Sequence, residues 1–338
     1  MPTESFHDQP VLPAEADGLP ERFFDRFMFN MHAVDGSPPE IIVGCGLYPP
    51  RDVADGFVLL ATETEQRSLV HSTELSDTDW RSAGPFSFEC VTENQEWRLR
   101  LGPNETGLEM DATWRARAPY SWSRVDVDNA SDEATSFDHL VQSGHYSGTI
   151  TIHGQQRSID GWYGQRDRSR GVRTMQGGQG LHIWYQAQFP DRCVGFLLVE
   201  SRTGERMLLE GAVMHTDGEV DDIVDVTHDL IFDDGLDLRS GTVLVQTRAG
   251  RSYRIHADAS ARGLYLAGAG YGGHHGKARG RDFREASVWP LDGSVTPRQL
   301  DSSLTDRLAT FDWEGTAGSG IFEFALSRSN SYTYRPSL

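Results

Sequence analysis

The chain has 338 residues, and its 50 Asp and Glu against 31 Lys and Arg give a formal net charge of −19 at pH 7. This excess of negative charge repels phosphate backbones and anionic lipid headgroups, so we expect no nucleic acid and no membrane among the partners. The 8 Trp, 10 Tyr and 16 Phe supply enough apolar surface for a sizeable core, which excludes a disordered, coiled-coil or fibrous protein.

Cysteine usage and the first residues address the compartment. Cys45, Cys90 and Cys193 are isolated, with no CxxC pair, which is typical of a reducing environment. The first 20 residues lack the basic and apolar regions of a signal peptide, and no apolar run reaches the length of a membrane span. We therefore expect a cytoplasmic protein without membrane insertion.

Alternation with a period of two dominates the chain and predicts β-structure. In residues 96–101 and 108–116, apolar side chains alternate with charged ones on either side of a Gly-containing turn, the pattern of a half-buried antiparallel hairpin. Further hairpins are predicted at residues 147–161, 194–213 and 241–259, and a short helix only at 20–28 or 299–308. Strands at this spacing indicate an all-β sandwich or barrel, and the loop at 174–180 is the candidate boundary between two β-domains.

A glycine-rich run at 268–273 matches the text of a dinucleotide fingerprint, but the next residues predict a loop and then a strand. Without a helix N-terminus to hold a pyrophosphate, nucleotide binding is not expected. The neighbouring His274 and His275 lack acidic or Cys partners at metal-binding spacing, so a solvated loop pair is favoured. The sequence therefore predicts neither a metal nor another cofactor.

The segment 161–173 holds an unusual density of aromatic and charged residues, among them Trp162, Tyr163, Arg166 and Asp167. Arginines beside acids and aromatic rings predict a buried ionic network with rings stacked on guanidinium planes. Such a network is either a latch between domains or the wall of a pocket, and the residues alone favour the latch.

Candidate site residues also occur on two later strands. In residues 180–189, His182 and Trp184 share one face, while Tyr185 lies on the opposite, core-forming face. The His182 face is either a cavity wall or a solvent-exposed rim. Glu210 shares a face with Leu208 and Ala212, and a carboxylate among apolar neighbours suits a general acid, although a water-exposed barrel mouth is its commoner setting.

Near the start of the chain, polar residues interrupt Phe-rich strands, including Asn30 and Tyr48. Buried polar groups must be hydrogen-bonded, so these form a structural network by default and a pocket lining as the alternative. The chain has no GxSxG nucleophile elbow, HExxH or CxxC motif. A cofactor-free site or a pure binding cavity remains.

Six segments occur in the order found in one known superfamily: DRFMFNMH, GCGLYPPRDVADGF, SGHYSGTITIHG, WYGQRDRSRGVR, LHIWY and GAGYGGHHGKARG. Over roughly residues 20–330 the chain resembles the hydroxyneurosporene synthase (carotenoid 1,2-hydratase)/AttH-like superfamily, in its uncharacterised bacterial branch. One departure is Arg170-Gly171, where the superfamily usually has Trp-Gly. The resemblance implies two consecutive lipocalin-like antiparallel β-barrel domains at 19–177 and 178–338, preceded by a disordered or surface arm at 1–18.

The resemblance also implies function. Similar proteins are lyases, isomerases or cyclases that act on hydrophobic substrates without metal or nucleotide. Glu210 is then the predicted proton donor, Trp184 stabilises a developing cation, and His182 orients the acid or activates water. The predicted substrate-binding residues are Tyr185, Trp162, Tyr163, Arg166, Asp167, Tyr48 and Asn30.

The sequence therefore predicts a cofactor-independent lyase or isomerase that hydrates, dehydrates, isomerises or cyclises a terpenoid-, steroid- or polyketide-like substrate. The alternative is a non-catalytic, lipocalin-like carrier of a hydrophobic small molecule. A third, weaker alternative is an interaction protein that uses its acidic surface. We expect a monomer or homodimer with the hydrophobic small molecule as its partner.

Overall fold

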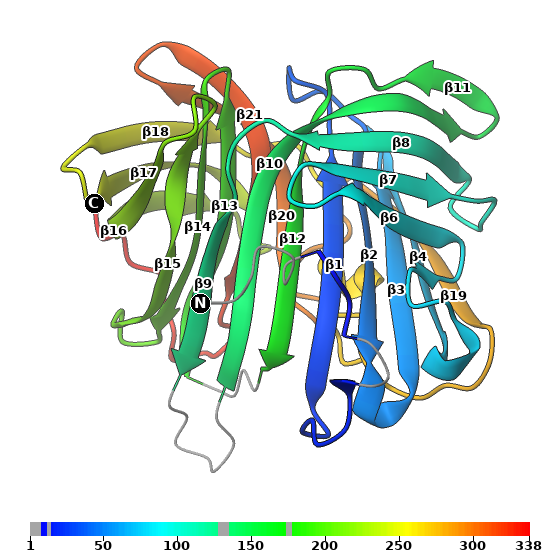
Figure 1. Ribbon diagram of the computed structural model, residues 1–338. Coiled ribbons are helices and arrows are strands. Elements are labelled where there is room, and N and C mark those ends of the chain that lie inside the picture. Colours follow the sequence, from blue (N-terminus) through cyan, green and yellow to red (C-terminus); the bar gives the residue numbers. More distant parts are fainter. Residues whose placement is uncertain (1–7, 12–14, 128–134, 174–177) are drawn as a thin grey trace.

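A computed structural model describes residues 8–11, 15–127, 135–173 and 178–338. The fold is almost entirely antiparallel β, and Figure 1 shows a closed barrel beside a curled open sheet. This confirms the predicted all-β class with lipocalin-like barrel units. No helix of the described ranges is long and apolar enough to cross a membrane.

The first sheet has 13 strands, with the order β19-β4-β3-β2-β1-β12-β10-β8-β7-β6-β5, and β9 and β11 also pair with the long strand β10. Its strands are β1 (Phe23–Met31), β2 (Glu40–Tyr48), β3 (Val53–Ala61), β4 (Glu65–Glu74), β5 (Ser82–Ala83), β6 (Phe86–Thr92), β7 (Glu96–Leu101), β8 (Leu108–Ala116), β9 (Ser121–Val127), β10 (Thr135–Ile152), β11 (Gln155–Ser158), β12 (Tyr163–Val172) and β19 (Phe283–Pro290).

The second sheet closes into a barrel in the order β13-β14-β15-β16-β17-β18-β20-β21. Its strands are β13 (Gln179–Phe189), β14 (Arg192–Ser201), β15 (Arg206–His215), β16 (Val220–Phe232), β17 (Leu238–Thr247), β18 (Ser252–Asp258), β20 (Thr305–Trp313) and β21 (Thr316–Leu326). Three single-turn 3₁₀ helices complete the described structure: η3 (Pro49–Arg51), η4 (Leu75–Asp77) and η5 (Leu266–Ala269).

The predicted hairpins are confirmed, because alternation fixes which side chains face the core. Trp97 lies opposite Trp114 across β7 and β8, with both side chains buried. The short helix predicted at 20–28 or 299–308 is wrong, since these residues enter β1 and β20. Apolar side chains occupy both faces of β1, and such a run has no clear period from which strand and helix could be told apart.

Each β-unit has its own core, and a third cluster joins the two. The barrel interior is filled by buried side chains that include Tyr185, whose ring stacks on Phe196 at 4.9 Å between centroids. The first sheet encloses a separate core around Trp97 and Trp114. The third cluster, with Trp184 and Leu197 from the barrel, lies where the outer faces of the two units meet. The barrel interior is packed, and a cavity of about 90 Å³ lies at this seam instead.

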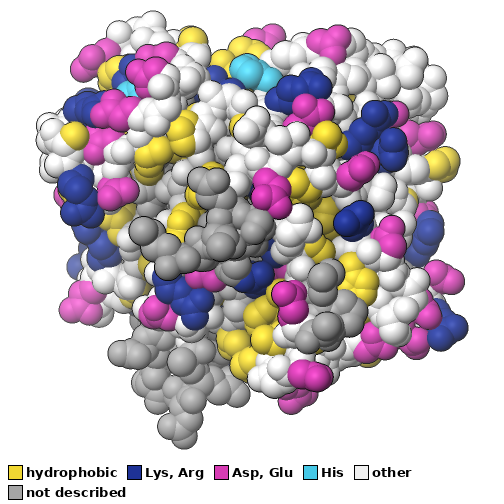
Figure 2. Space-filling model, viewed as in Figure 1, with side chains coloured by type: hydrophobic (Ala, Val, Ile, Leu, Met, Phe, Trp, Pro, Cys, Tyr) yellow, Lys and Arg dark blue, Asp and Glu magenta, His cyan; other side chains and the backbone are white. Residues whose placement is uncertain are grey.

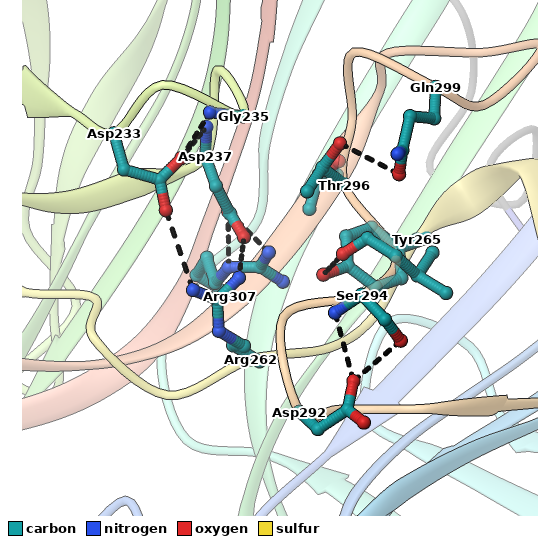
Figure 3. A network of polar contacts seen from close by, with 12 residues as sticks. Asp233, Gly235, Asp237, Arg262, Tyr265, Asp292, Ser294, Thr296, Gln299 and Arg307 are labelled. Atoms are coloured by element: carbon teal, nitrogen blue, oxygen red, sulfur yellow. Dashed lines mark hydrogen bonds and ion pairs between the residues drawn. The ribbon is translucent and has the colours of Figure 1, made fainter.

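The chain leaves the barrel between β18 and β20. It forms η5 and then β19, which pairs with β4 of the first sheet. Figure 3 shows Arg262 and Arg307 converging on Asp237, and the Nε of Arg307 donates to that carboxylate at 3.0 Å. This network connects the segment between β18 and β20 to the barrel. The proposed domain boundary within 174–180 stays a prediction, and residues 174–177 lie outside the described ranges.

Part of the predicted N-terminal arm is described and packs on the first sheet. Asp8 is buried and its carboxylate contacts the Arg166 guanidinium at 2.5 Å. The Val11 N–H donates to Asp25 at 2.8 Å. The remaining residues of the arm that the structure describes, 15–18, lie nearer the surface.

Candidate functional site

A cavity of about 90 Å³ lies between the outer face of the barrel and the outer face of the first sheet. Its lining combines apolar side chains, including Met28, Phe57, Trp184 and Leu304, with ionisable groups. This volume holds several water molecules or the end of a larger molecule. The ionisable lining comprises Arg26, Asp55, His139, Asp167, Arg173, His182, Tyr271, His275 and Glu323.

The barrel contributes one lateral row of side chains across five strands. Asp306 lies opposite Glu323, Glu323 opposite Trp184, Trp184 opposite Leu197, and Leu197 opposite Glu210. Directly opposed residues in antiparallel strands project from the same face. The row therefore places an aromatic ring between two carboxyl groups on the surface that faces the first sheet.

The first sheet contributes a second row toward the same space. His139 lies opposite Ser169, Ser169 opposite Arg26, Arg26 opposite Gly46, and Gly46 opposite Asp55. Gly46 is required by close packing, because a Cβ there would come within 2.7 Å of the Asp55 carboxylate and 2.6 Å of the Tyr48 hydroxyl. The missing side chain leaves room for both polar groups.

Glu323 and His182 form a buried pair in the cavity wall. The His182 Nε2 and Glu323 Oε1 atoms are 2.7 Å apart. Burial, together with the positive charges of Arg173 and His139, lowers the pKa of His182 to about 3, so this imidazole is neutral. Burial raises the pKa of Glu323 to about 7, although a hydrogen bond from Asp306 opposes that rise. Burial and the neighbouring Glu323 raise the pKa of Asp306 well above its usual range.

His139 joins the two β-units and has the opposite charge state. Its Nε2 is 2.6 Å from the Asp167 carboxylate, and its Nδ1 contacts the Glu210 carboxylate of the barrel. Burial opposes the charged form, but the two carboxylates outweigh it and raise the pKa of His139 to about 10. The imidazolium has no ring nitrogen left for a ligand. It therefore acts as an ionic clamp between the first sheet and the barrel.

The glycine-rich segment covers one end of the cavity. The Gly276 N–H donates to Asp55 at 2.6 Å, and His275 Nδ1 is 3.6 Å from the same carboxylate. The ring of His275 packs edge-on against Tyr271 with centroids 4.7 Å apart. The expectation of a solvated His274–His275 pair is wrong, because the side chain of His275 is only 15% exposed and lines the cavity. The expected loop followed by a strand is confirmed by β19.

Three of the predicted site residues line the main cavity: His182, Trp184 and Asp167. Glu210 lies one step away, in a smaller pocket that it shares with His139 and Trp184. Its carboxylate contacts an imidazolium, so the apolar surroundings expected for it are not present. The catalytic roles of Glu210, His182 and Trp184 stay predictions.

The other predicted residues lie away from the main cavity. Tyr185 points into the barrel core. Tyr48 is buried and its hydroxyl accepts from Arg26 at 3.0 Å, behind the cavity wall. Asn30 is buried and accepts from the Gln165 N–H at 2.9 Å. Trp162 packs against the core of the first sheet, and Tyr163 packs beside the Arg117 guanidinium.

The arginine-rich strand β12 splits between two faces. Asp167 reaches the cavity, whereas Arg166 points into the first sheet, where its guanidinium lies 5.6 Å from the Trp97 ring centroid. Arg168 pairs there with Asp25 at 2.9 Å. The predicted ionic network exists, but its acids are Asp8 and Asp25 and its rings come from other strands. It therefore joins the N-terminal segment to the sheet.

Sequence reasoning missed several of the cavity's ionisable groups, above all Glu323 and His139. The sequence does contain one indication of Glu323: it is the only charged residue in the apolar run GIFEFAL. For His139, the sequence gives no indication of a functional role beyond its position in a predicted strand. Among the residues that the structure describes, no three His, Cys, Asp or Glu side chains are grouped so as to hold a metal ion.

The chain belongs to a family of unknown function (DUF8625), whose profile matches residues 5–329. No curated protein matches it. Among solved structures, it resembles an AttH-type protein of Nitrosomonas europaea with a TM-score of 0.62 at 11% identity, covering 94% of this chain and 99% of that one. It also resembles CghA, solved with Sch210972, with a TM-score of 0.51 at 10% identity over 92% and 90% of the two chains.

A further structural match is kievitone hydratase of Nectria haematococca, with a TM-score of 0.49 at 12% identity over 95% and 94% of the two chains. At these identities, the two matches with TM-scores above 0.5 show a shared fold and nothing further.

Proposed function

We propose that this member of DUF8625 is a cofactor-independent lyase or isomerase that protonates a hydrophobic substrate in the cavity at the seam. One observation carries the proposal: a carboxyl group with its pKa raised to about 7, Glu323, sits in the cavity wall between Asp306 and Trp184 and contacts a neutral imidazole. Titratable groups whose environments push their pKa values apart are typical of acid–base sites. The neutral His182 and the cationic His139 in the same cavity are such a pair.

Glu323 is the proposed proton donor. In a hydration, its O–H bond breaks, the proton forms a new C–H bond at an alkene, and positive charge develops on the neighbouring carbon. The π-face of Trp184, on the adjacent strand, stabilises that charge. Water adds to the cation and gives up a proton that returns to the Glu323 carboxylate through His182. Loss of a proton from the cation without addition of water gives an isomer instead.

Glu210 does not take the donor role in this proposal. Its carboxylate contacts the cationic His139 and is therefore already engaged in the ionic clamp between the two β-units. Glu210 instead holds His139 at the seam, and it lines the smaller pocket together with Trp184.

The dimensions of the cavity restrict the substrate. A volume of about 90 Å³ accepts the reacting end of a terpenoid-, steroid- or polyketide-like molecule and leaves the rest outside. Met28, Phe57 and Leu304 form an apolar wall for that end. Binding there removes water from Glu323 and strengthens the electrostatic interactions inside.

The test uses a metabolite extract from the source organism with the gene deleted. Purified protein is added, and compounds are followed by mass spectrometry for the gain or loss of one water, or for isomerisation with deuterium uptake from heavy water. We expect conversion by the wild type, a loss of at least about 10²-fold in Glu323→Gln, and none in the exposed control Glu109→Gln.

Two outcomes contradict the proposal. If Glu323→Gln converts the substrate at the wild-type rate, Glu323 is not the proton donor. If the wild type and Glu323→Gln both bind a compound and neither converts it, the protein is a carrier.

A further inference from the structure

Two arginines line the cavity from neighbouring strands. Arg26 lies on β1 and Arg173 follows the end of β12, and both border the space beside Glu323. Their guanidinium carbons lie 4.8 Å and 5.7 Å from the centroid of the same ring, that of Phe24. The two cations therefore lie around one ring, and burial, with a contribution from the positive charge of Arg26, lowers the pKa of Arg173.

Neither guanidinium has a carboxylate partner within the part of the chain that the structure describes. Arg26 Nε donates to the Tyr48 hydroxyl at 3.0 Å, and Arg173 Nη2 donates to the Ser169 hydroxyl at 3.3 Å. The Nε of Arg173 is buried and has no hydrogen-bond acceptor. A guanidinium carries five N–H donors, so among the described residues these two side chains have donors to spare for a ligand.

The fully buried arginines among the described residues each pair with a carboxylate. Arg166 pairs with Asp8, Arg168 with Asp25, and Arg307 with Asp237. Burying a cation without a partner is costly, and natural proteins usually avoid it outside functional sites. Arg26 and Arg173 are half-buried in the cavity wall and have no such carboxylate among the described residues.

The acids of the cavity are engaged elsewhere. Asp55 accepts from the Gly276 N–H, Asp167 contacts His139, and Glu323 contacts His182. None of them lies within ion-pair distance of Arg26 or Arg173 among the described residues. An incoming anion would therefore meet two cations without displacing an existing salt bridge.

We propose that Arg26 and Arg173 bind a carboxylate of the substrate, which makes the substrate class a hydrophobic carboxylic acid. This inference rests on the proposed function, because only that function makes the bound carboxylic acid a substrate. Planar guanidinium groups match the geometry of a carboxylate in a bidentate manner. With the carboxylate at the arginines, the apolar body lies along Met28 and Phe57 and reaches Glu323.

The experiment compares ligands that differ only in the anionic group. Binding to the purified protein is measured by isothermal titration calorimetry for hexanoate against hexan-1-ol, and for 3-phenylpropanoate against 3-phenylpropan-1-ol. We expect each carboxylate to bind about tenfold more tightly than its alcohol, because a charge-assisted hydrogen bond is lost with the charge.

Three variants locate the effect. Arg173→Gln and Arg26→Gln should each remove most of the preference for the carboxylate while leaving the affinity for the alcohol unchanged, and retained alcohol binding shows that the cavity has folded. Arg248→Gln removes the same charge from an exposed site on the barrel and should keep the wild-type preference.

Equal affinity of acid and alcohol for the wild type overturns the inference, and so does an unchanged preference in both cavity variants. If one variant does not fold, the other decides. The result is separable from the proposed function, because the preference is measured without turnover. A preference that persists when Glu323→Gln converts substrate normally supports the anion subsite and rejects only the proton donor.

Discussion

The chemistry of the site depends on which carboxyl group keeps its proton. Glu323 and Asp306 lie directly opposite each other on β21 and β20, and both are buried. Two neighbouring buried carboxyl groups cannot both ionise without a large energetic penalty, so the pair retains a proton at neutral pH. Asp306 is the member with the strongly raised pKa, and it donates to Glu323.

Removing the Asp306 hydrogen bond should make Glu323 a weaker acid. Because that bond lowers the pKa of Glu323, Asp306→Ala should raise the pKa above about 7 and extend the protonated form to higher pH. The alkaline limb of the pH–rate profile should move upward by about 0.5–1 unit. The measurement is the pH dependence of conversion, with the carboxyl stretch followed by infrared titration.

Asp306→Asn is the matched control, since its amide N–H can still donate to Glu323. Its limb should stay close to that of the wild type. A downward shift in Asp306→Ala would contradict this account of the pair.

At the level of strands, alternation predicts faces but does not predict neighbours. The sequence places His182 and Trp184 on one face of β13, and the structure has them there. Glu323 lies 141 positions from His182, and only the pairing of β13 with β21 brings them together. His139 and Glu210 are 71 positions apart and meet across the seam between the two units. No local pattern in the sequence encodes either contact.

The same limit explains the residues assigned to the wrong surroundings. Tyr185 faces the core, as alternation predicts, but the barrel core is solid and offers no space for a ligand. Arg166 and Asp167 are adjacent, so a strand must send them to opposite faces. Their density in the sequence indicated an ionic cluster but not which side of the sheet would become the cavity.

The glycine on β2 provides a test at the scale of an element. In Gly46→Ala, the new Cβ would overlap the Tyr48 hydroxyl and the Asp55 carboxylate, and both side chains are buried. We expect a loss of about 1–3 kcal/mol in the free energy of unfolding, typical of overpacking.

Gly102→Ala serves as the control, because its nearest contact would be at 3.8 Å. We expect that change to stay within about 0.5 kcal/mol. Denaturant unfolding measures both, and equal effects of the two substitutions would show that β2 does not need glycine at this position.

Over the whole molecule, charges are interspersed at the surface, and the unusual ionisable groups are buried near the seam. Figure 2 shows acidic and basic side chains distributed over one face without an extended patch of Lys and Arg in its described part. The net charge of −19 therefore says little about the site. Beneath the surface, Glu40 on β2 interacts with Asp306 of the barrel, so the buried carboxyl groups extend across the seam.

These groups couple the stability of the protein to pH. Burial and the proximity of Asp306 raise the pKa of Glu40 from 4.5 to about 8, against the opposing effects of Arg307 and the Leu308 N–H. Between these values the folded state holds a proton that the unfolded chain has released. The contribution of Glu40 to stability is thus fully present below about pH 4.5 and is lost as the pH rises through about 8. The lowered pKa values of His32, His71 and His182 have the opposite effect, and their contribution is complete above about pH 6.5.

Across the window from about pH 6.5 to 8.5, the contributions of the three histidines with lowered pKa values are complete. His139, whose pKa is raised to about 10, also loses its stabilising contribution across this window, so the effect of Glu40 is taken from the difference between the wild type and Glu40→Gln. Across this window, the wild type should lose stability, and Glu40→Gln should lose on the order of 2 kcal/mol less, since glutamine fills the same space and does not titrate. Denaturant unfolding at the two pH values measures the difference. The exposed control Glu109→Gln should follow the wild type. If Glu40→Gln loses stability as steeply as the wild type, the proton is not held at Glu40, and the buried carboxyl groups do not extend from the cavity to β2.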